Sequence, residues 1–225
     1  MISTQHSLIL FDCDGTLTNS HGIIVQAMQQ AFQSVDLLPP DADAVNRIIG
    51  LSLGNAVIGL MPAELHDDAQ LHQQIEQAYR QHYLLAEHEV VLFPHVRETL
   101  EALRERGYWL GVVTGKSKSG LLRVLESFDL ADLFYVLRTA DCTHSKPHPA
   151  MVLECMQEMG MKAVQTVVIG DALFDIQMAE AAGVRSLGVS FGVAEAELLL
   201  QAGAEEVVND FSELLQYFPL LQDLP

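Results

Sequence analysis

Short β-rich runs alternate with helical stretches from Tyr108 onward, and this alternation limits the folds open to the chain. It is typical of repeated strand–helix–strand units, which build a parallel sheet with helices on both faces. An apolar run near the start adds one more strand to the expected sheet. We expect strands at residues 7–12, 109–114, 134–138, 166–170 and 184–189, and a weaker one at 206–208. The pattern therefore predicts an α/β fold with a Rossmann-like three-layer core.

The segment between the first strand and residue 90 has a different pattern, in which apolar residues recur at helical spacing. Two proline-containing breaks interrupt it, at 39–40 and 61–62. We therefore expect four helices, at residues 21–35, 41–49, 53–60 and 67–87. They would form a cap, residues 19–87, inserted into a core of residues 1–18 and 88–225. Such an insert is either a structural elaboration or a lid, and its position directly after the first strand favours a lid.

The charge balance limits the partners of the chain. Thirty acidic residues against twelve basic ones give a formal net charge of −18. This field repels polyanions, so we expect neither nucleic acid nor an acidic membrane surface as a partner. The three cysteines are odd in number and widely spaced, which argues against a disulfide framework. Since the apolar run at 8–11 is also too short for a signal peptide, we expect a cytoplasmic protein.

The first strand ends in two carboxylates, Asp12 and Asp14, followed by Gly15 and Thr16. Alternate residues of a continuing strand share one face, so the two carboxylates would repel each other unless a cation lies between them or one is protonated. Gly15 allows the chain to turn sharply at this point. A solvated corner between strand and turn is the plain structural interpretation. It does not explain the paired charges, which favour a cation site.

Cys13 lies between these two carboxylates and has to be considered as a nucleophile. Its neighbours would raise the pKa of the thiol and so weaken it as a nucleophile. A small apolar side chain that faces the core is the better interpretation of Cys13.

A threonine, Thr114, ends the second strand at the sheet edge where open α/β folds bind ligands. A hydrogen bond to the local backbone is the usual role of such a residue, so its significance depends on where it lies relative to Asp12. The surrounding run, 111–117, also suggests a nucleotide-binding P-loop. That motif needs four residues between its glycines and here there are three, so we exclude it.

Lys146 lies next to Pro147 and close to Pro149, and these prolines restrict its backbone. An ammonium held in this way can neutralise both a carboxylate and an incoming phosphate, although a surface lysine is the ordinary alternative. Asp171 follows the strand at 166–170, and Asp175 lies four residues later on the same helical face. Asp171 alone could be a helix cap, but a cap does not explain Asp175.

Oxygen ligands beside a phosphate site favour Mg²⁺ over zinc. Four histidines of the insert offer an alternative metal site, but they are spaced by six and ten residues and do not share a helix face. We interpret them as solvated surface residues: His66, His72, His82 and His88.

Taken together, the run 12–20, Thr114, Lys146 and the run 171–175 resemble, in order, the four motifs of the haloacid dehalogenase superfamily. The match extends over nearly the whole chain. A helical insert after the first motif is similar to the cap of its phosphoglycolate phosphatase-like branch. The fourth motif departs from the usual pattern: phosphatases of this superfamily often have Ser or Thr after the first Asp, whereas this chain has Ala172. A supporting hydrogen bond is therefore expected to be missing there.

The resemblance implies a role for each catalytic residue. Asp12 would attack phosphorus and form an aspartyl-phosphate. Asp14, kept partly protonated by acidic surroundings, would donate a proton to the leaving alcohol and then activate water. Thr114, Lys146 and Mg²⁺ would stabilise charge on the equatorial oxygens.

It also implies a metal site. Mg²⁺ would be held by Asp12, Asp171 and the backbone carbonyl of Asp14, and Asp175 would orient Lys146 or a metal-bound water. Gly15 and Gly115 would support these groups within their motifs.

We therefore expect a Mg²⁺-dependent phosphatase that hydrolyses a small phosphorylated metabolite, similar to phosphoglycolate phosphatases. Asp14 argues against a dehalogenase, which needs no proton donor for a halide. The absence of lysine between Asn19 and Val90 argues against a phosphonatase. A phosphosugar mutase of the β-phosphoglucomutase type, a pyrophosphatase or a nucleotidase remain alternatives. A non-catalytic binding protein with the same fold is a further one, although the intact motifs disfavour it.

The substrate is expected to meet a cation of the insert, which has only Arg47 and Arg80. Arg47 lies just before the loop at 50–53 and is our candidate for binding a substrate carboxylate. Lys116 and Arg138 are the rival cations on the core side.

Overall fold

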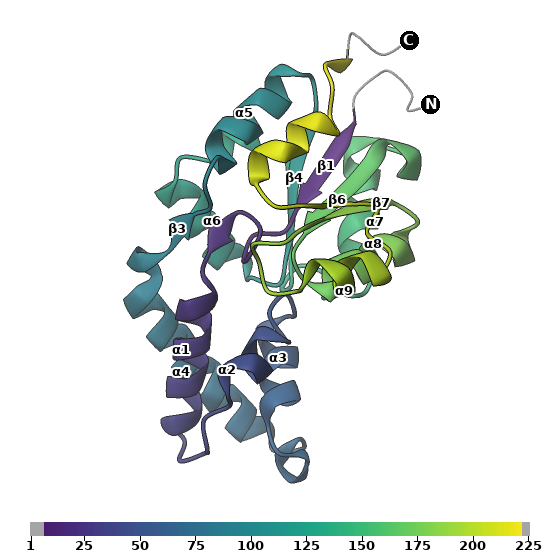
Figure 1. The fold of residues 1–225 in the computed structure, drawn as a ribbon. Coiled ribbons are helices and arrows are strands. Elements are labelled where there is room, and N and C mark those ends of the chain that lie inside the picture. Colours follow the sequence, from purple (N-terminus) through teal and green to yellow (C-terminus); the bar gives the residue numbers. More distant parts are fainter. Residues whose placement is uncertain (1–6, 222–225) are drawn as a thin grey trace.

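The computed structural model describes residues 7–221, and its central feature is one parallel sheet of six strands in the order β5-β4-β1-β6-β7-β8 (Figure 1). Each strand lies within about two residues of its expected position, and the strands at 109–114 and 166–170 have the expected bounds. The predicted α/β class is confirmed. The strands are β1 Leu8–Phe11, β4 Trp109–Thr114, β5 Val136–Thr139, β6 Thr166–Gly170, β7 Arg185–Val189 and β8 Val207–Val208.

Alternating side chains of the strands supply the two faces of the sheet. Ile9 and Phe11 of β1 pack with helices α5 and α6 and the 3-10 helix η5, whereas Leu8 and Leu10 pack with α7 and α8. This alternation follows from the period of two in a strand. The result is a sheet between two helical layers. The core helices are α5 Val96–Glu105, α6 Lys118–Ser127, α7 Ala150–Met159, α8 Leu173–Ala182, α9 Ala196–Gln201 and η5 Phe211–Gln216, with short 3-10 turns η3 Ala131–Leu133 and η4 Ala163–Gln165.

The segment after β1 forms a separate helical lobe beside the carboxyl edge of the sheet (Figure 1). Its apolar side chains form their own buried cluster, which includes Met28, Phe32 and Ile75. Polar side chains mark the helix starts; for example, Ser52 accepts a hydrogen bond from the Asn55 amide. The helices are α1 His21–Gln33, α2 Ala42–Asn46, α3 Leu53–Leu60 and α4 Ala69–Ala86, with 3-10 turns η1 Ala63–Leu65 and η2 Glu87–Glu89.

A small antiparallel ribbon joins the helical lobe to the sheet. Its strands are β2 Thr18–Asn19 and β3 Val91–Leu92, which the sequence pattern missed because two residues show no periodicity. Both chain crossings between lobe and sheet pass through this ribbon. We propose the division into core 1–18 and 88–225 and cap 19–87 on this basis; residues 1–6 and 222–225 lie outside the described part. No helix within residues 7–221 is both long and apolar enough to span a membrane.

Candidate active site

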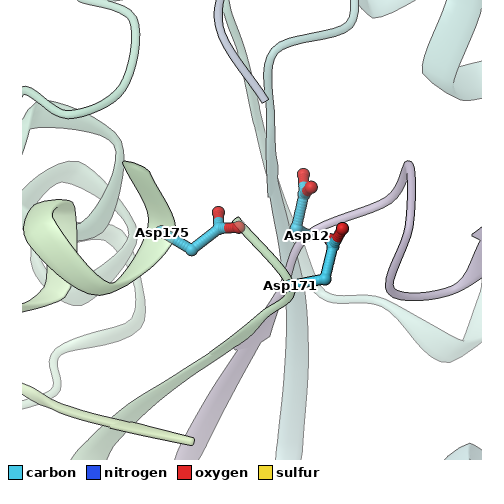
Figure 2. Close-up of side chains that lie close together, drawn as sticks. All are labelled: Asp12, Asp171 and Asp175. Atoms are coloured by element: carbon cyan, nitrogen blue, oxygen red, sulfur yellow. The ribbon is translucent and has the colours of Figure 1, made fainter. Parts of the chain in front are cut away.

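Three adjacent strands bring the candidate catalytic side chains to one edge of the sheet. β1 lies between β4 and β6, so Asp12 after β1 lies between Thr114 at the end of β4 and Asp171 after β6. The chain leaves β1 for the cap, returns in β4 on one side and later enters β6 on the other, which makes this edge the switch point where such folds bind ligands. Figure 2 shows Asp12 and Asp171 side by side at the strand ends, with Asp175 reaching toward them from α8.

Lys146 lies inside this group of carboxylates rather than on the surface. Its ammonium nitrogen is 2.6 Å from Asp12 Oδ1 and 2.6 Å from Asp175 Oδ1, and all three side chains are buried. Burial raises the pKa values of both carboxyls, although Lys146 opposes the shift. Burial alone would lower the pKa of Lys146, but the two carboxylates outweigh it and raise that pKa above its ordinary value. Lys146 is therefore a charged ammonium.

The cluster has uncompensated negative charge that a divalent cation could neutralise. Asp12, Asp171 and Asp175 each offer a carboxylate oxygen, and these oxygens lie within 4.8 Å of one another. With all groups ionised, three carboxylates and one ammonium have a net charge of two minus. Asp12 Oδ2 is buried, and no donor in the described chain hydrogen-bonds to it. An all-oxygen donor set with an unsatisfied oxygen fits Mg²⁺ chemistry.

Asp171 is held in place by the turn that follows β1 and by the loop after β7. Its Oδ1 accepts a hydrogen bond from the Thr16 hydroxyl at 2.9 Å, and its Oδ2 accepts one from the Val193 amide at 2.9 Å. His21 Nε2 lies 3.6 Å from Oδ2. Neither Thr16 nor Val193 was predicted to support Asp171. Thr16 lies inside the first motif and could have been found there, whereas only the fold brings Val193 close.

Gly15 has no space for a side chain. Its φ is +89°, and an added Cβ would lie 2.1 Å from Asp171 Oδ2 and 2.4 Å from His21 Nε2.

Gly15→Ala should therefore displace Asp171 and lower the free energy of unfolding by about 1–3 kcal/mol. Urea denaturation checks this. Gly22→Ala is the matched control, because a Cβ there meets nothing within 4 Å and should stabilise α1 by about 0.5–1 kcal/mol. Equal stabilities of the two variants would contradict this account of Gly15.

Asp14 faces a cation, so the expectation of acidic surroundings is wrong. Lys116 Nζ lies 3.0 Å from Asp14 Oδ1, and the Ser20 hydroxyl donates to the same oxygen at 2.6 Å. Lys116 also donates to the Tyr83 hydroxyl of α4 at 2.8 Å. Burial alone would lower the pKa of Lys116, but the attraction of the Asp14 carboxylate outweighs this effect. The pKa of Lys116 therefore lies well above its ordinary value. Burial raises the pKa of Tyr83 to about 12, which keeps its hydroxyl neutral.

Cys13 points into the core, as expected. It is fully buried against the helices on one face of the sheet, and burial raises the pKa of its thiol. A neutral buried thiol is a poor nucleophile.

A cavity of about 410 Å³ lies between the sheet edge and the cap. Asp12, Asp14 and Thr114 line it from the core, and the cap contributes mainly apolar and aromatic side chains, including Tyr79 and Tyr83. The core side of the cavity thus presents carboxylates and a hydroxyl, and the cap side is mainly apolar.

Of the cations considered from the sequence, the rival Lys116 lines this cavity and the preferred Arg47 does not. Arg47 is exposed and does not line the cavity, so the structure does not support its assignment as the carboxylate-binding residue. Lys116, Arg80 and Arg123 line it instead. Arg138 pairs with two glutamates of α7 and is also absent from the lining.

A loop of the cap touches the core at Gly115. A Cβ on Gly115 would lie 2.3 Å from the Leu51 carbonyl oxygen, so glycine allows this close approach. The Ser52 amide donates to Ser145 Oγ at 2.9 Å, beside Lys146. Ala172 packs under the same loop: a Cβ added to Gly50 would lie 3.3 Å from the Cβ of Ala172. Ala172 has no side-chain hydroxyl, and its amide donates to Asp175 Oδ2 at 3.1 Å.

Comparison with known proteins agrees with this geometry. The family described as haloacid dehalogenase-like hydrolase matches residues 9–189. The chain is 32% identical to probable phosphatase IndB of Dickeya dadantii, over 92% of this chain and 91% of the relative. It is 30% identical to pyrophosphatase PpaX of Bacillus pumilus, with 92% and 94% covered. It is also 30% identical to phosphoglycolate phosphatase of Salmonella typhimurium, with 92% and 90% covered.

The same branch is found among solved structures. A predicted phosphoglycolate phosphatase from Haemophilus somnus superposes with a TM-score of 0.83 at 26% identity, covering 97% of this chain and all of that one. The family match, the relatives and the fold agree with the four motifs gathered at one sheet edge. The chain therefore belongs to the haloacid dehalogenase-like hydrolase family and to its phosphoglycolate phosphatase-like branch.

Proposed function

We propose that the protein is a Mg²⁺-dependent phosphatase that hydrolyses a small phosphorylated metabolite through an aspartyl-phosphate. The observation that carries this proposal is the environment of Asp12: a buried carboxylate with one unsatisfied oxygen, paired with Lys146 and open to the cavity under the cap. The family membership supports it. The net charge of the chain, −18, and its widely spaced cysteines support the proposal of a cytoplasmic protein with no nucleic-acid or membrane partner.

The proposed reaction has two successive displacements at phosphorus. An Asp12 oxygen forms a bond to phosphorus while the bond to the leaving oxygen breaks, and Asp14, in its protonated form, gives that oxygen a proton. Water then attacks the aspartyl-phosphate, Asp14 takes a proton from the water, and Asp12 is released with inorganic phosphate. Lys146 and the Thr114 hydroxyl stabilise negative charge on the phosphoryl oxygens. The cap excludes bulk water during both steps.

The metal-binding residues would be Asp12 and Asp171 through their side chains and Asp14 through its backbone carbonyl. Bound Mg²⁺ would supply positive charge against the phosphoryl oxygens. Asp175 already accepts from Lys146 and from the Ala172 amide, so we assign it to the orientation of Lys146 rather than to the metal.

A phosphate monoester is the preferred substrate, and phosphoglycolate is the candidate that the branch suggests. Pyrophosphatase activity is the second candidate, because one relative of 30% identity is a pyrophosphatase. Both reactions use the same attack on phosphorus and differ in the leaving group.

Turnover of a panel of phosphate esters and pyrophosphate, with and without Mg²⁺, tests the proposal. We expect small monoesters to be hydrolysed, activity to fall at least about hundredfold with a chelator, and Mg²⁺ to restore it. Zn²⁺ should not restore it, because the site has only oxygen donors. Turnover unaffected by chelation would contradict the metal assignment, and hydrolysis of pyrophosphate alone would select the second candidate.

A further inference from the structure

Each of the two aspartates of the first motif has its own lysine. Lys146 lies 2.6 Å from Asp12, and Lys116 lies 3.0 Å from Asp14. The two lysines differ in their other partner. Lys146 pairs with Asp175 of the core, whereas Lys116 donates to Tyr83 of the cap helix α4. One lysine is thus anchored wholly in the core, and the other joins core and cap.

The core holds the backbone of Lys116 tightly. Its amide donates to Thr114 Oγ1 at 3.2 Å, and its carbonyl accepts from the Ala140 amide at 3.1 Å. Only its side chain extends toward the cap. The Lys116 side chain is 9% exposed, far less than the side chains of Arg80 at 57% and Arg123 at 43%, which also line the cavity.

The cap partner is equally well fixed. Tyr83 is buried, and its ring stacks on Tyr79 at a centroid distance of 5.8 Å. The Lys116 ammonium lies 4.6 Å from the centre of the Tyr83 ring, so it is attracted by the ring as well as by the hydroxyl. A change in the position of α4 would break both contacts with Tyr83 and leave the ion pair with Asp14.

We propose that Lys116 is a positioning residue that connects the cap to Asp14, so that Asp14 is held for proton transfer only while the cap covers the site. This inference rests on the proposed function. It assigns Tyr83 as the cap contact that sets the position of Lys116. Neither residue transfers a proton or touches phosphorus.

The proposal makes the effect of Lys116 depend on the leaving group. An alkyl phosphate needs a proton on its departing oxygen, whereas the departing nitrophenolate of nitrophenyl phosphate does not. The constant kcat/KM reports the steps up to release of this group. A loss of Asp14 positioning therefore lowers kcat/KM for the alkyl ester much more than for the nitrophenyl ester.

Lys116→Met and Tyr83→Phe test this, with glycerol phosphate and nitrophenyl phosphate as the two esters. We expect Lys116→Met to lower kcat/KM for the alkyl ester by about tenfold to hundredfold and for the nitrophenyl ester by less than about threefold. Tyr83→Phe keeps the ring and should show the same selectivity with a smaller loss, about threefold to tenfold. The double variant should match Lys116→Met alone, since Tyr83 acts through Lys116.

Glu87→Gln is the control. Glu87 makes a different contact between cap and core, to Arg123 at 2.8 Å, and it does not touch Asp14. Its effect should be equal on both esters and should multiply with that of Lys116→Met. Equal losses on both esters in Lys116→Met would overturn the inference, as would a Glu87→Gln variant with the same selectivity as Tyr83→Phe. A wild-type protein that hydrolyses no ester would overturn the proposed function and this inference with it.

Discussion

Asp12→Asn is expected to lower kcat by at least about 10⁴-fold. Asparagine has almost the same shape as aspartate, but its amide cannot attack phosphorus. A loss of this size corresponds to about 5.5 kcal/mol of activation free energy. Steady-state turnover measures the loss. Mass spectrometry of rapidly quenched protein should find a phosphoryl group on the wild type and none on the variant.

The control for this substitution is Asp67→Asn, which removes a carboxylate from an exposed position of the cap. Its kcat should remain within about twofold of the wild type, since surface substitutions away from the site have small effects. If Asp12→Asn retained turnover within tenfold of the wild type, Asp12 would not be the nucleophile. A phosphorylated Asp12→Asn protein would place the covalent step on another residue.

The sheet could be predicted because each strand shows its own local pattern. The run 166–170, for example, has four β-branched residues followed by a glycine, and the strand β6 has the same bounds. The convergence of Asp12, Lys146 and Asp171 followed from topology, because parallel strands place their carboxyl ends at one edge. These features depend on residues near each other in sequence or on a general rule of sheets.

The contacts across the boundary between cap and core could not be predicted in the same way. Lys116 and Tyr83 are 33 positions apart, one in the core and the other in the cap, so their contact depends on how far α4 lies from the sheet. Arg47 was chosen because it precedes the loop at 50–53. The short helix α2 instead leaves its side chain exposed. Sequence identifies the cations of the cap but not the direction in which each points.

Lys146→Met is expected to lower the free energy of unfolding by about 3–5 kcal/mol in the presence of a chelator, and to abolish detectable turnover. Methionine fills a similar volume but leaves Asp12 and Asp175 buried without the ammonium that lies 2.6 Å from each. Breaking a buried ion pair by removing one partner is costly because the remaining charge is not compensated. Urea denaturation measures this loss, and Lys162→Met, at an exposed position, serves as the control.

The loss of unfolding free energy caused by Lys146→Met should be smaller at mildly acidic pH than at neutral pH. Burial already raises the pKa values of Asp12 and Asp175, and removal of the ammonium removes the interaction that opposes this shift. A carboxyl with a raised folded pKa binds its proton more tightly in the folded state, so its contribution to stability is lost as the pH rises from the unfolded pKa through the folded one. Asp175→Asn added to Lys146→Met should recover part of the stability at neutral pH without recovering turnover, because the phosphate still lacks its cation. A deficit that is the same at both pH values, or a double variant that is no more stable than the single one, would show that packing rather than charge gives Lys146 its structural role.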